Sequence, residues 1–301
     1  MARRPDANAG SVPGNGAAPP GLLERVLAGR LLILAPHMDD ETLACGGTIL
    51  LHADPNMVHC LFATDGAASP APLLPWLGTV GPELVARRRQ EAQAATRVLG
   101  VPEANLEFLD LPDGGLAARK AELESALGRA VSRLQPEFVF APFRYDVHPD
   151  HVALNRAARA VLRRLDRAPA LLEYFVYHRL RGVPGGDVRA ALRDDALLTV
   201  DAAGVADAKR AALDCYISQA TLQYDWQDRP ILAEENLRQR CAEPEVFLPT
   251  DPAASLDEGF AAHARRIRLA TLAMRLGKRP KDQAAALLRW ALGSAPGSRR
   301  R

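Results

Sequence analysis

Two short runs of histidine and acidic residues stand out in the 301-residue chain. The first run is His37-Met38-Asp39-Asp40-Glu41, and the second is Asp146-Val147-His148-Pro149-Asp150-His151. Burying several carboxylates beside imidazoles is costly, because like charges repel and each charged group loses its hydration. A divalent cation removes that cost. The two runs together therefore predict a metal site with further acid and base groups beside it.

The spacing within the runs indicates which side chains could meet. If the first run forms a turn, His37 and Asp40 can converge on one metal ion while Asp39 points to the remaining coordination position. Pro149 suits the first turn of a helix, whose start would present His151 inward as a third ligand. Two histidines and one carboxylate with open positions make a hydrolytic zinc site. Each run alone is also compatible with a helix cap or a turn.

The segments around the two runs predict an α/β fold. Strand-like segments span residues 30–36, 57–64, 106–109, 137–142 and 171–177, and helical segments follow the first run and span 83–99, 117–134 and 149–165. This alternation predicts a Rossmann-like, doubly wound, mostly parallel sheet with helices on both faces, in a single catalytic domain. Ligands of such sheets bind at the carboxyl ends of the strands, which is where both runs lie.

The alternation of strand-like and helical segments is less clear beyond residue 182. A strand is expected near 197–200 and a helix over 203–219, followed by irregular structure and C-terminal helices. Gly46-Gly47 would let the helix after the first run approach the sheet closely. The loop over 67–82, rich in Pro, Gly and Ala, is a candidate lid over a sugar face or a plain surface loop.

Three parts are expected along the chain: a disordered leader over residues 1–27, the catalytic domain over 28–250, and a basic, mostly helical extension with a frayed end over 251–301. The net charge of +2 hides an asymmetry, because residues 261–301 carry eleven basic residues and one acid, or +10, which leaves −8 for residues 1–260. We favour a solvated basic helix, partly docked on the acidic body, over a tail that binds nucleic acid or an anionic membrane surface.

Other classes of protein are disfavoured. No window of 18 or more uncharged apolar residues occurs and the opening residues lack the apolar core of a signal peptide, so we expect no membrane span and a cytoplasmic location. Four widely spaced cysteines without a C-x-x-C pair argue against a disulfide framework or a thiolate zinc site. No G-x-G-x-x-G follows the first strand, which argues against a dinucleotide-binding module, and G-x-S-x-G and H-E-x-x-H are also absent.

The motifs PHMDDE and HPDH resemble those of the PIG-L/LmbE-like zinc-dependent N-deacetylases, whose pattern is HPDDE after Ala or Pro, followed later by HPDH. Further similarity lies in RRQEAQAATRVLGV (with Arg88 and Glu91), LDLPDG (with Asp113) and KRAALDCYISQ (with Lys209, Ser218 and Gln219), and it extends from about residue 30 to about residue 250. The resemblance implies a hydrolase that removes an acetyl group from a small-molecule N-acetylated amino sugar or its conjugate, of the N-acetylglucosaminyl type.

Carried over position by position, the resemblance also implies roles for individual residues. One Zn²⁺ per chain, with Fe²⁺ as the alternative, would be bound by three ligands: His37, Asp40 and His151. Asp39 would be the general base that acts on metal-bound water. A protonated His148, oriented by Asp150, would stabilise the oxyanion or return a proton. Arg88 and Asp113 would lie near the sugar, although a helix-face ion pair and a turn acid are equally compatible with them.

The sequence departs from the family pattern in its loops. Met38 replaces a proline, which affects the stiffness of the turn but none of the ligands. Some family members place a tyrosine two residues before the first His of HPDH to assist the oxyanion; here that position is Asp146, with Tyr145 adjacent, and the role of Tyr145 is open. All expected ligands are present, which argues against a non-catalytic relative. A differently specific amidase and a homo-oligomer are compatible with the sequence.

Overall fold

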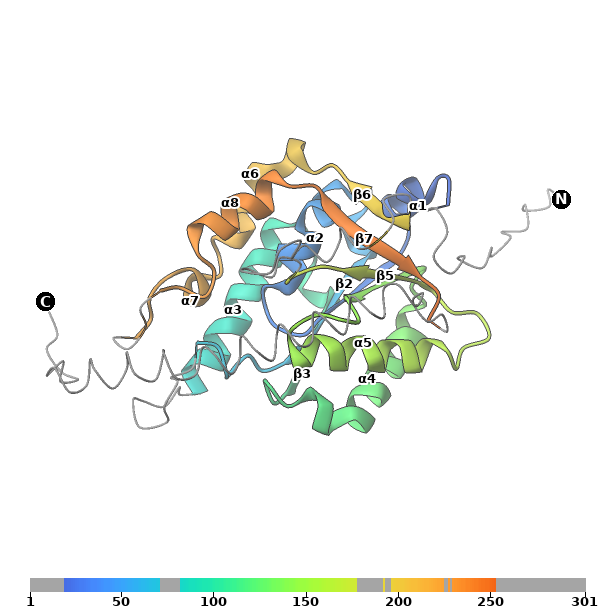
Figure 1. The fold of residues 1–301 in the computed structure, drawn as a ribbon, viewed down its shortest axis with the longest axis horizontal. Helices are drawn as coiled ribbons and strands as arrows, with labels where there is room; N and C mark the ends of the chain where they lie inside the picture. The colour runs from blue at the N-terminus through green and yellow to red at the C-terminus, as the bar shows by residue number, and fades with distance from the viewer. Residues whose placement is uncertain are drawn as a thin grey trace, which may run out of the picture.

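The structure, a computed structural model, describes residues 19–70, 82–177, 192, 196–224, 227 and 229–252. Its centre is a seven-stranded sheet in the order β3-β2-β1-β4-β5-β7-β6 (Figure 1). The strands are β1 (Leu31–Ala35), β2 (Val58–Thr64), β3 (Leu106–Leu111), β4 (Phe138–Pro142), β5 (Ala170–Tyr174), β6 (Leu198–Val200) and β7 (Glu245–Thr250). Strands β1 to β5 pair in parallel, whereas β7 is antiparallel to both β5 and β6. The predicted α/β class with a mostly parallel sheet is confirmed.

Helices cover both faces of this sheet. The α-helices are α1 (Leu22–Ala28), α2 (Asp40–Leu51), α3 (Pro82–Val98), α4 (Lys120–Leu134), α5 (Pro149–Leu162), α6 (Ala206–Leu213), α7 (Ile217–Ala220) and α8 (Glu234–Ala242). Short 3-10 turns lie at Pro55–Met57, Glu103–Asn105, Leu116–Arg119 and Ala203–Val205. Helices α1, α2, α3, α6 and α8 contribute to the apolar cluster on one face, and α4 and α5 pack together over the other (Figure 1).

Strand β1 shows why the first run lies at the edge of the sheet. Leu31, Ile33 and Ala35 belong to the cluster under α2 and α3, while Leu32 and Leu34 belong to the cluster under α4 and α5. Because successive side chains of a strand point to opposite faces, a strand covered on both sides must be apolar along its whole length. The apolar run ends at the carboxyl end of β1, so the polar residues that follow emerge there.

The structure differs from the predicted elements in three places. Residues 22–27 belong to helix α1 and not to a disordered leader, because Leu22 and Val26 pack into the core. Residues 245–250 form strand β7 where irregular structure was expected, and this strand pairs with β5, far away in the chain. The expected helix over 203–219 is divided into α6 and α7, with the break at the buried Tyr216.

Some predicted features lie outside the described residues. These are residues 1–18 of the leader, residues 71–81 of the candidate lid and residues 253–301 of the basic extension. Among the helices that are described, none is long and apolar enough to cross a membrane.

Candidate metal centre

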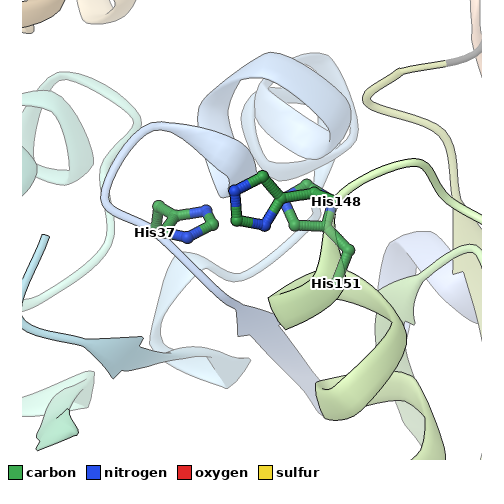
Figure 2. A group of neighbouring side chains, drawn as sticks. All are labelled: His37, His148 and His151. Carbon is green, nitrogen blue, oxygen red and sulfur yellow. The ribbon is translucent and has the colours of Figure 1, made fainter. Parts of the chain in front are cut away.

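The two polar runs lie at the carboxyl ends of neighbouring parallel strands. The first run follows β1 and enters α2, and the second follows β4 and enters α5. Because β1 and β4 pair in parallel, both runs reach the same edge of the sheet. Figure 2 shows the result: His37 comes from the loop after β1, and its ring faces those of His148 and His151 at the start of α5.

The carboxylate of Asp40 lies between two of these imidazoles. Its Oδ2 atom is 3.1 Å from Nδ1 of His37 and 3.3 Å from Nε2 of His151. Ligand atoms at about 2.0 Å from a tetrahedrally coordinated ion lie roughly 3.3 Å apart, so these separations suit one shared cation. The structure thus brings together the three predicted ligands.

Unpaired ring nitrogens provide a second test of whether the residues fit a cation. Nε2 of His37 and both ring nitrogens of His151 are buried, and within the described ranges none of them has a partner in hydrogen-bond geometry, although each lies 3.2–3.4 Å from a carboxylate oxygen. Buried polar atoms without a partner are uncommon, and each needs an explanation such as a bound ion. The orphaned Nε2 of His151 is the atom that faces Asp40, so the side chains present fit a metal ion at this place.

Two overlapping groups of possible ligands surround His37. Ligand atoms of His37, His148 and His151 lie within 4.8 Å of one another, and so do those of His37, Asp113 and Asp150. In the second group Nε2 of His37 is 3.2 Å from Oδ1 of Asp113 and 3.4 Å from Oδ2 of Asp150. These carboxylates contact the ring nitrogen that faces away from Asp40. They can orient the His37 ring, as carboxylates behind metal-bound histidines commonly do.

The carboxylate of Asp146 contacts the ring nitrogen of His151 that faces away from Asp40. Its Oδ2 is 3.3 Å from Nδ1 of His151, and its Oδ1 accepts a hydrogen bond from the backbone N–H of His148 at 2.8 Å. The carboxylate is therefore placed to fix the ring of His151 while Nε2 faces Asp40. The sequence analysis assigned no role to Asp146 itself. It noted only that some family members have a tyrosine at this position.

Asp150 contacts His148 through its backbone and not through its carboxylate. The Asp150 N–H donates to Nδ1 of His148 at 3.3 Å, whereas the carboxylate accepts hydrogen bonds from the N–H groups of Gly114 (2.7 Å) and Leu116 (3.1 Å). The expected orientation of His148 by the Asp150 carboxylate is thus replaced by orientation through a backbone amide. Because Nδ1 accepts, the ring proton of a neutral His148 resides on Nε2, which is left to donate.

Asp39 has an unusual backbone conformation. Its φ is 149° and its ψ is −26°, immediately before the first residue of α2. A non-glycine residue in such a region is strained, and the strain persists only where the surroundings maintain it. The N–H of Asp39 donates to Oε2 of Glu41 at 3.2 Å, and its carboxylate is 3.6 Å from Nη2 of Arg88.

Arg88 on α3 connects this strained residue to a neighbouring loop. Its side chain is 1% exposed, and its guanidinium donates to the backbone carbonyls of Met38 (2.8 Å), Gly66 (3.3 Å) and Ser69 (3.4 Å). The charge of Arg88 is therefore directed at Asp39 and at loop carbonyls. Contact of Arg88 with a sugar stays a prediction, as does that of Asp113, whose Oδ2 accepts a hydrogen bond from the Ala68 N–H at 3.0 Å.

Burial and neighbouring charges move the pKa values of Asp39 and His148 in opposite directions. Burial raises the pKa of Asp39 to about 7, although Arg88 opposes the shift. Burial lowers the pKa of His148 to about 4, helped by the positive charges of His37 and His151. Asp39 thus titrates near neutrality, which suits a general base. His148 is neutral there, so the expected protonated form is not the one that this environment favours.

The pKa values of the two predicted histidine ligands are raised. Burial alone would lower them, but contacts with Asp113, Asp150 and Asp40 keep the pKa of His37 well above its usual value. Asp40 and Asp146 likewise raise the pKa of His151 to about 9. The cluster of carboxylates thus favours positive charge at both rings. A divalent cation supplies such charge to neutral imidazole ligands, whose protons it displaces.

Tyr177 is a residue of this site that sequence reasoning missed. Its ring centroid is 6.4 Å from that of His148 and 5.4 Å from that of His151. The ring of Tyr145, in contrast, packs on Phe143 at 5.9 Å. The signal that could have found Tyr177 is its position just beyond β5, the strand next to β4 in the sheet.

Taken together, the parallel sheet, two histidines and an aspartate at adjoining strand ends, and a buried carboxyl group with a pKa near 7 define an α/β protein with the residues of a metal-dependent hydrolase. Residues 32–162, which include both polar runs, match the family described as GlcNAc-PI de-N-acetylase (PIG-L). These residues therefore resemble the PIG-L family.

Several known proteins are similar over a longer part of the chain. The 2'-N-acetylparomamine deacetylase of Streptomyces fradiae is 28% identical over 216 residues, which are 66% of this chain and 76% of the relative. The 1D-myo-inositol 2-acetamido-2-deoxy-alpha-D-glucopyranoside deacetylase of Rhodococcus jostii is 25% identical over 262 residues, covering 69% of this chain and 90% of the relative. Among solved structures, the conserved protein TT1542 from Thermus thermophilus has a TM-score of 0.54 at 26% identity, over 76% of this chain and 98% of that one.

Proposed function

We propose that this protein is a metal-dependent deacetylase that hydrolyses the acetamide of an N-acetylated amino sugar or its conjugate. The observation that carries the proposal is the position of Asp40 between His37 and His151, with Asp39 next to it in the chain. The match of residues 32–162 to the PIG-L family supports the reaction, and the acetylated amino sugars in the names of the two relatives support the substrate class.

Zinc is the metal that we propose. Two imidazoles and one carboxylate with open positions form a common set of catalytic zinc ligands, and Fe²⁺ would suit the same set. When bound by His37, Asp40 and His151, the cation would polarise the amide carbonyl and acidify water.

Asp39 is suited to accept a proton from the attacking water. Its pKa of about 7 leaves the carboxylate largely charged just above neutrality and still basic enough to take the proton. The neighbouring guanidinium of Arg88 favours the charged form. The water oxygen bonds to the acetyl carbon, and the C–N bond then breaks as the proton held by Asp39 passes to the leaving nitrogen. The products are acetate and the free amine.

His148 is suited to donate a hydrogen bond to the carbonyl oxygen. The Asp150 N–H occupies Nδ1, so a neutral ring presents its proton at Nε2. Negative charge develops on the carbonyl oxygen during attack, and a preorganised donor stabilises it more in the transition state than in the ground state. This role requires no positive charge on His148. Binding of the sugar by Arg88 and Asp113 is part of the proposal, as are a single catalytic domain that includes helix α1 and ends near residue 250, and a cytoplasmic location.

The experiment is to compare the zinc-loaded wild type with Asp39→Asn on a panel of N-acetylglucosamine conjugates. We expect the wild type to release acetate, and we expect Asp39→Asn to lower kcat by about 10²-fold or more without loss of bound zinc, because the variant lacks only the base. Asp207→Asn, on the exposed surface of α6, is the matched control. Full activity of Asp39→Asn on a confirmed substrate would show that Asp39 is not the base.

A further inference from the structure

A four-residue segment far from both polar runs in the sequence packs against the candidate metal centre. This segment, Tyr216-Ile217-Ser218-Gln219, includes helix α7's first residues and is called the YISQ segment below. Tyr216, Ser218 and Gln219 are fully buried, whereas Ile217 is 55% exposed. A surface segment would show the reverse, with its apolar residue inside. Buried hydroxyl and amide groups need hydrogen-bond partners. The partners of Tyr216, Ser218 and Gln219 all lie beside the candidate metal centre.

Tyr216 acts on the backbone of Asp39 through Glu41. The hydroxyl of Tyr216 donates to Oε1 of Glu41, and Oγ1 of Thr42 donates to the same oxygen at 2.6 Å. The other oxygen of Glu41 accepts the N–H of Asp39 at 3.2 Å. Tyr216 therefore fixes the carboxylate that holds the strained peptide of Asp39.

Ser218 holds helix α3 beside Arg88. Its N–H and its hydroxyl donate to the two carboxylate oxygens of Glu91, at 2.8 Å and 2.6 Å. Glu91 lies three residues after Arg88 on α3, and residues at this spacing share one face of a helix. The bidentate contact thus fixes the rotation of α3 about its axis. This rotation determines whether Arg88 reaches Asp39.

Gln219 holds the loop that receives the guanidinium of Arg88. Its Nε2 donates to the carbonyl of Ser69 at 3.0 Å, and the Ser69 hydroxyl donates back to Oε1 of Gln219 at 3.2 Å. The same Ser69 carbonyl accepts from Nη1 of Arg88 at 3.4 Å. Arg88 and Gln219 therefore meet at one carbonyl oxygen.

We infer that Tyr216, Ser218 and Gln219 are positioning residues that hold Asp39 and Arg88 in their relative places. The three side chains fix three separate pieces of backbone: the turn before α2, helix α3 and the loop after β2. None of the three is required to touch substrate. A displacement of about 1 Å at a reacting group can lower a rate by roughly 10²-fold, so residues that fix these pieces matter for catalysis. The catalytic part of this inference rests on the proposed function.

Hydrogen–deuterium exchange of the zinc-loaded full chain tests the positioning without a substrate. Tyr216→Phe is expected to speed exchange in the peptide around Asp39 by roughly tenfold, while residues 65–70 exchange as in the wild type. Gln219→Ala is expected to show the opposite pattern, with faster exchange only at 65–70. Ile217→Ala, in the same segment but exposed, is the matched control and is expected to change neither. Unchanged exchange around Asp39 in Tyr216→Phe overturns the role of Tyr216.

The kinetic readout separates positioning from general stability. Tyr216→Phe is expected to lower kcat by roughly tenfold to hundredfold, with KM and bound zinc within about twofold of the wild type, because the base is misplaced while the ligands remain. Loss of zinc together with kcat would instead indicate a structural role and would overturn the inference. Should Tyr216→Phe fail to fold, Thr42→Val removes the other donor to Glu41, and the same change of exchange around Asp39 is expected.

The two readouts also distinguish failure of this inference from failure of the proposed function. If the wild type releases no acetate from any conjugate, the proposed function is wrong, and the exchange pattern still decides the positioning role. If the wild type is active and Tyr216→Phe matches it in both kcat and exchange, the positioning role is wrong and the proposed function stands.

Discussion

The pKa of Asp39 is set by neighbours that act in opposite directions. Burial raises the pKa of this carboxyl group, the guanidinium of Arg88 lowers it, and the adjacent Asp40 raises it again. The net value of about 7 depends on all of them. Substitution of one of these neighbours should shift the pKa of Asp39. The dependence of kcat on pH would show that shift.

We expect kcat of the zinc-loaded protein to fall about tenfold per pH unit below the pKa of Asp39, which burial raises to about 7 and which the charge of a bound cation would lower. Asp39 accepts a proton only when it is charged, and its raised pKa means that it becomes protonated as the pH falls through that value. Arg88→Gln should move the fall to higher pH, since the guanidinium lowers the pKa of Asp39. The measurement is kcat against pH for both proteins. A wild-type rate that stays flat well into the acidic range would contradict the assignment of Asp39 as the base.

Tyr177 and Tyr145 offer a matched pair of tyrosines near the second run. Only the ring of Tyr177 lies beside His148 and His151, while that of Tyr145 lies on Phe143. Tyr177→Phe is expected to lower kcat by about 10²-fold, as loss of a donor near a developing oxyanion does, and Tyr145→Phe is expected to change it much less. Steady-state kinetics on the same substrate provides the comparison. Equal effects of the two substitutions would refute a special role for Tyr177.

Helix α2, which begins at the first run, is held to the sheet edge by a buried carboxylate. Oε1 of Glu245 on β7 accepts the N–H of Gly47 at 2.6 Å, and Oε2 accepts that of Thr48 at 2.8 Å. Lys209 donates to the same carboxylate at 2.6 Å and balances its charge. The close approach requires glycine, because a Cβ atom at residue 47 would lie 2.3 Å from Cβ of Ala202.

Gly47→Ala is therefore expected to destabilise the fold by about 1–3 kcal/mol or more through overpacking. Gly128→Ala is the control, since a Cβ atom there meets nothing within 4 Å in α4. In that helix interior alanine should raise stability by about 0.5–1 kcal/mol. Chemical denaturation of the two variants measures the difference. A Gly47→Ala protein as stable as the wild type would show that α2 can move away from Ala202 at little cost.

The sequence predicts the elements whose residues interact locally and misses those that depend on distant partners. Strands β1 and β4 could be recognised, since burial on both faces makes them apolar throughout. Strand β7 could not, because its pairing with β5 is a long-range contact and its short sequence, EVFLPT, has no clear periodicity.

The same distinction holds for the site. The convergence of His37, Asp40 and His151 could be predicted because HMDDE and HPDH follow adjacent strands. The contact of Tyr216 with Glu41 joins residues 175 positions apart, and no local sequence pattern predicts it. The hydrogen bonds of the Asp150 carboxylate to Gly114 and Leu116 were missed for the same reason.

At the scale of the whole molecule, the strand order explains where the site forms. The chain adds β2 and β3 on one side of β1 and then β4 and β5 on the other. Ligands of open α/β sheets bind at the strand ends where this direction reverses, here between β1 and β4. All the residues proposed for metal binding and catalysis come from this junction and from the loops beside it.

Deleting residues 253–301 is expected to leave kcat within about twofold of the full chain, because the site is assembled from residues before this extension. The same deletion removes most of the +10 charge of residues 261–301. Acetate release by the two proteins is the comparison, with circular dichroism to check folding. A large loss of kcat in a folded, truncated protein would show that the extension contributes to the site.

The most direct measurement is acetate release from an N-acetylglucosamine conjugate after chelation and during titration with Zn²⁺. We predict that the chelated protein is inactive and that activity returns until about one equivalent of zinc per chain is bound, because His37, Asp40 and His151 form one three-ligand site. Acetate release that continues undiminished in the metal-free protein would contradict metal-dependent deacetylation.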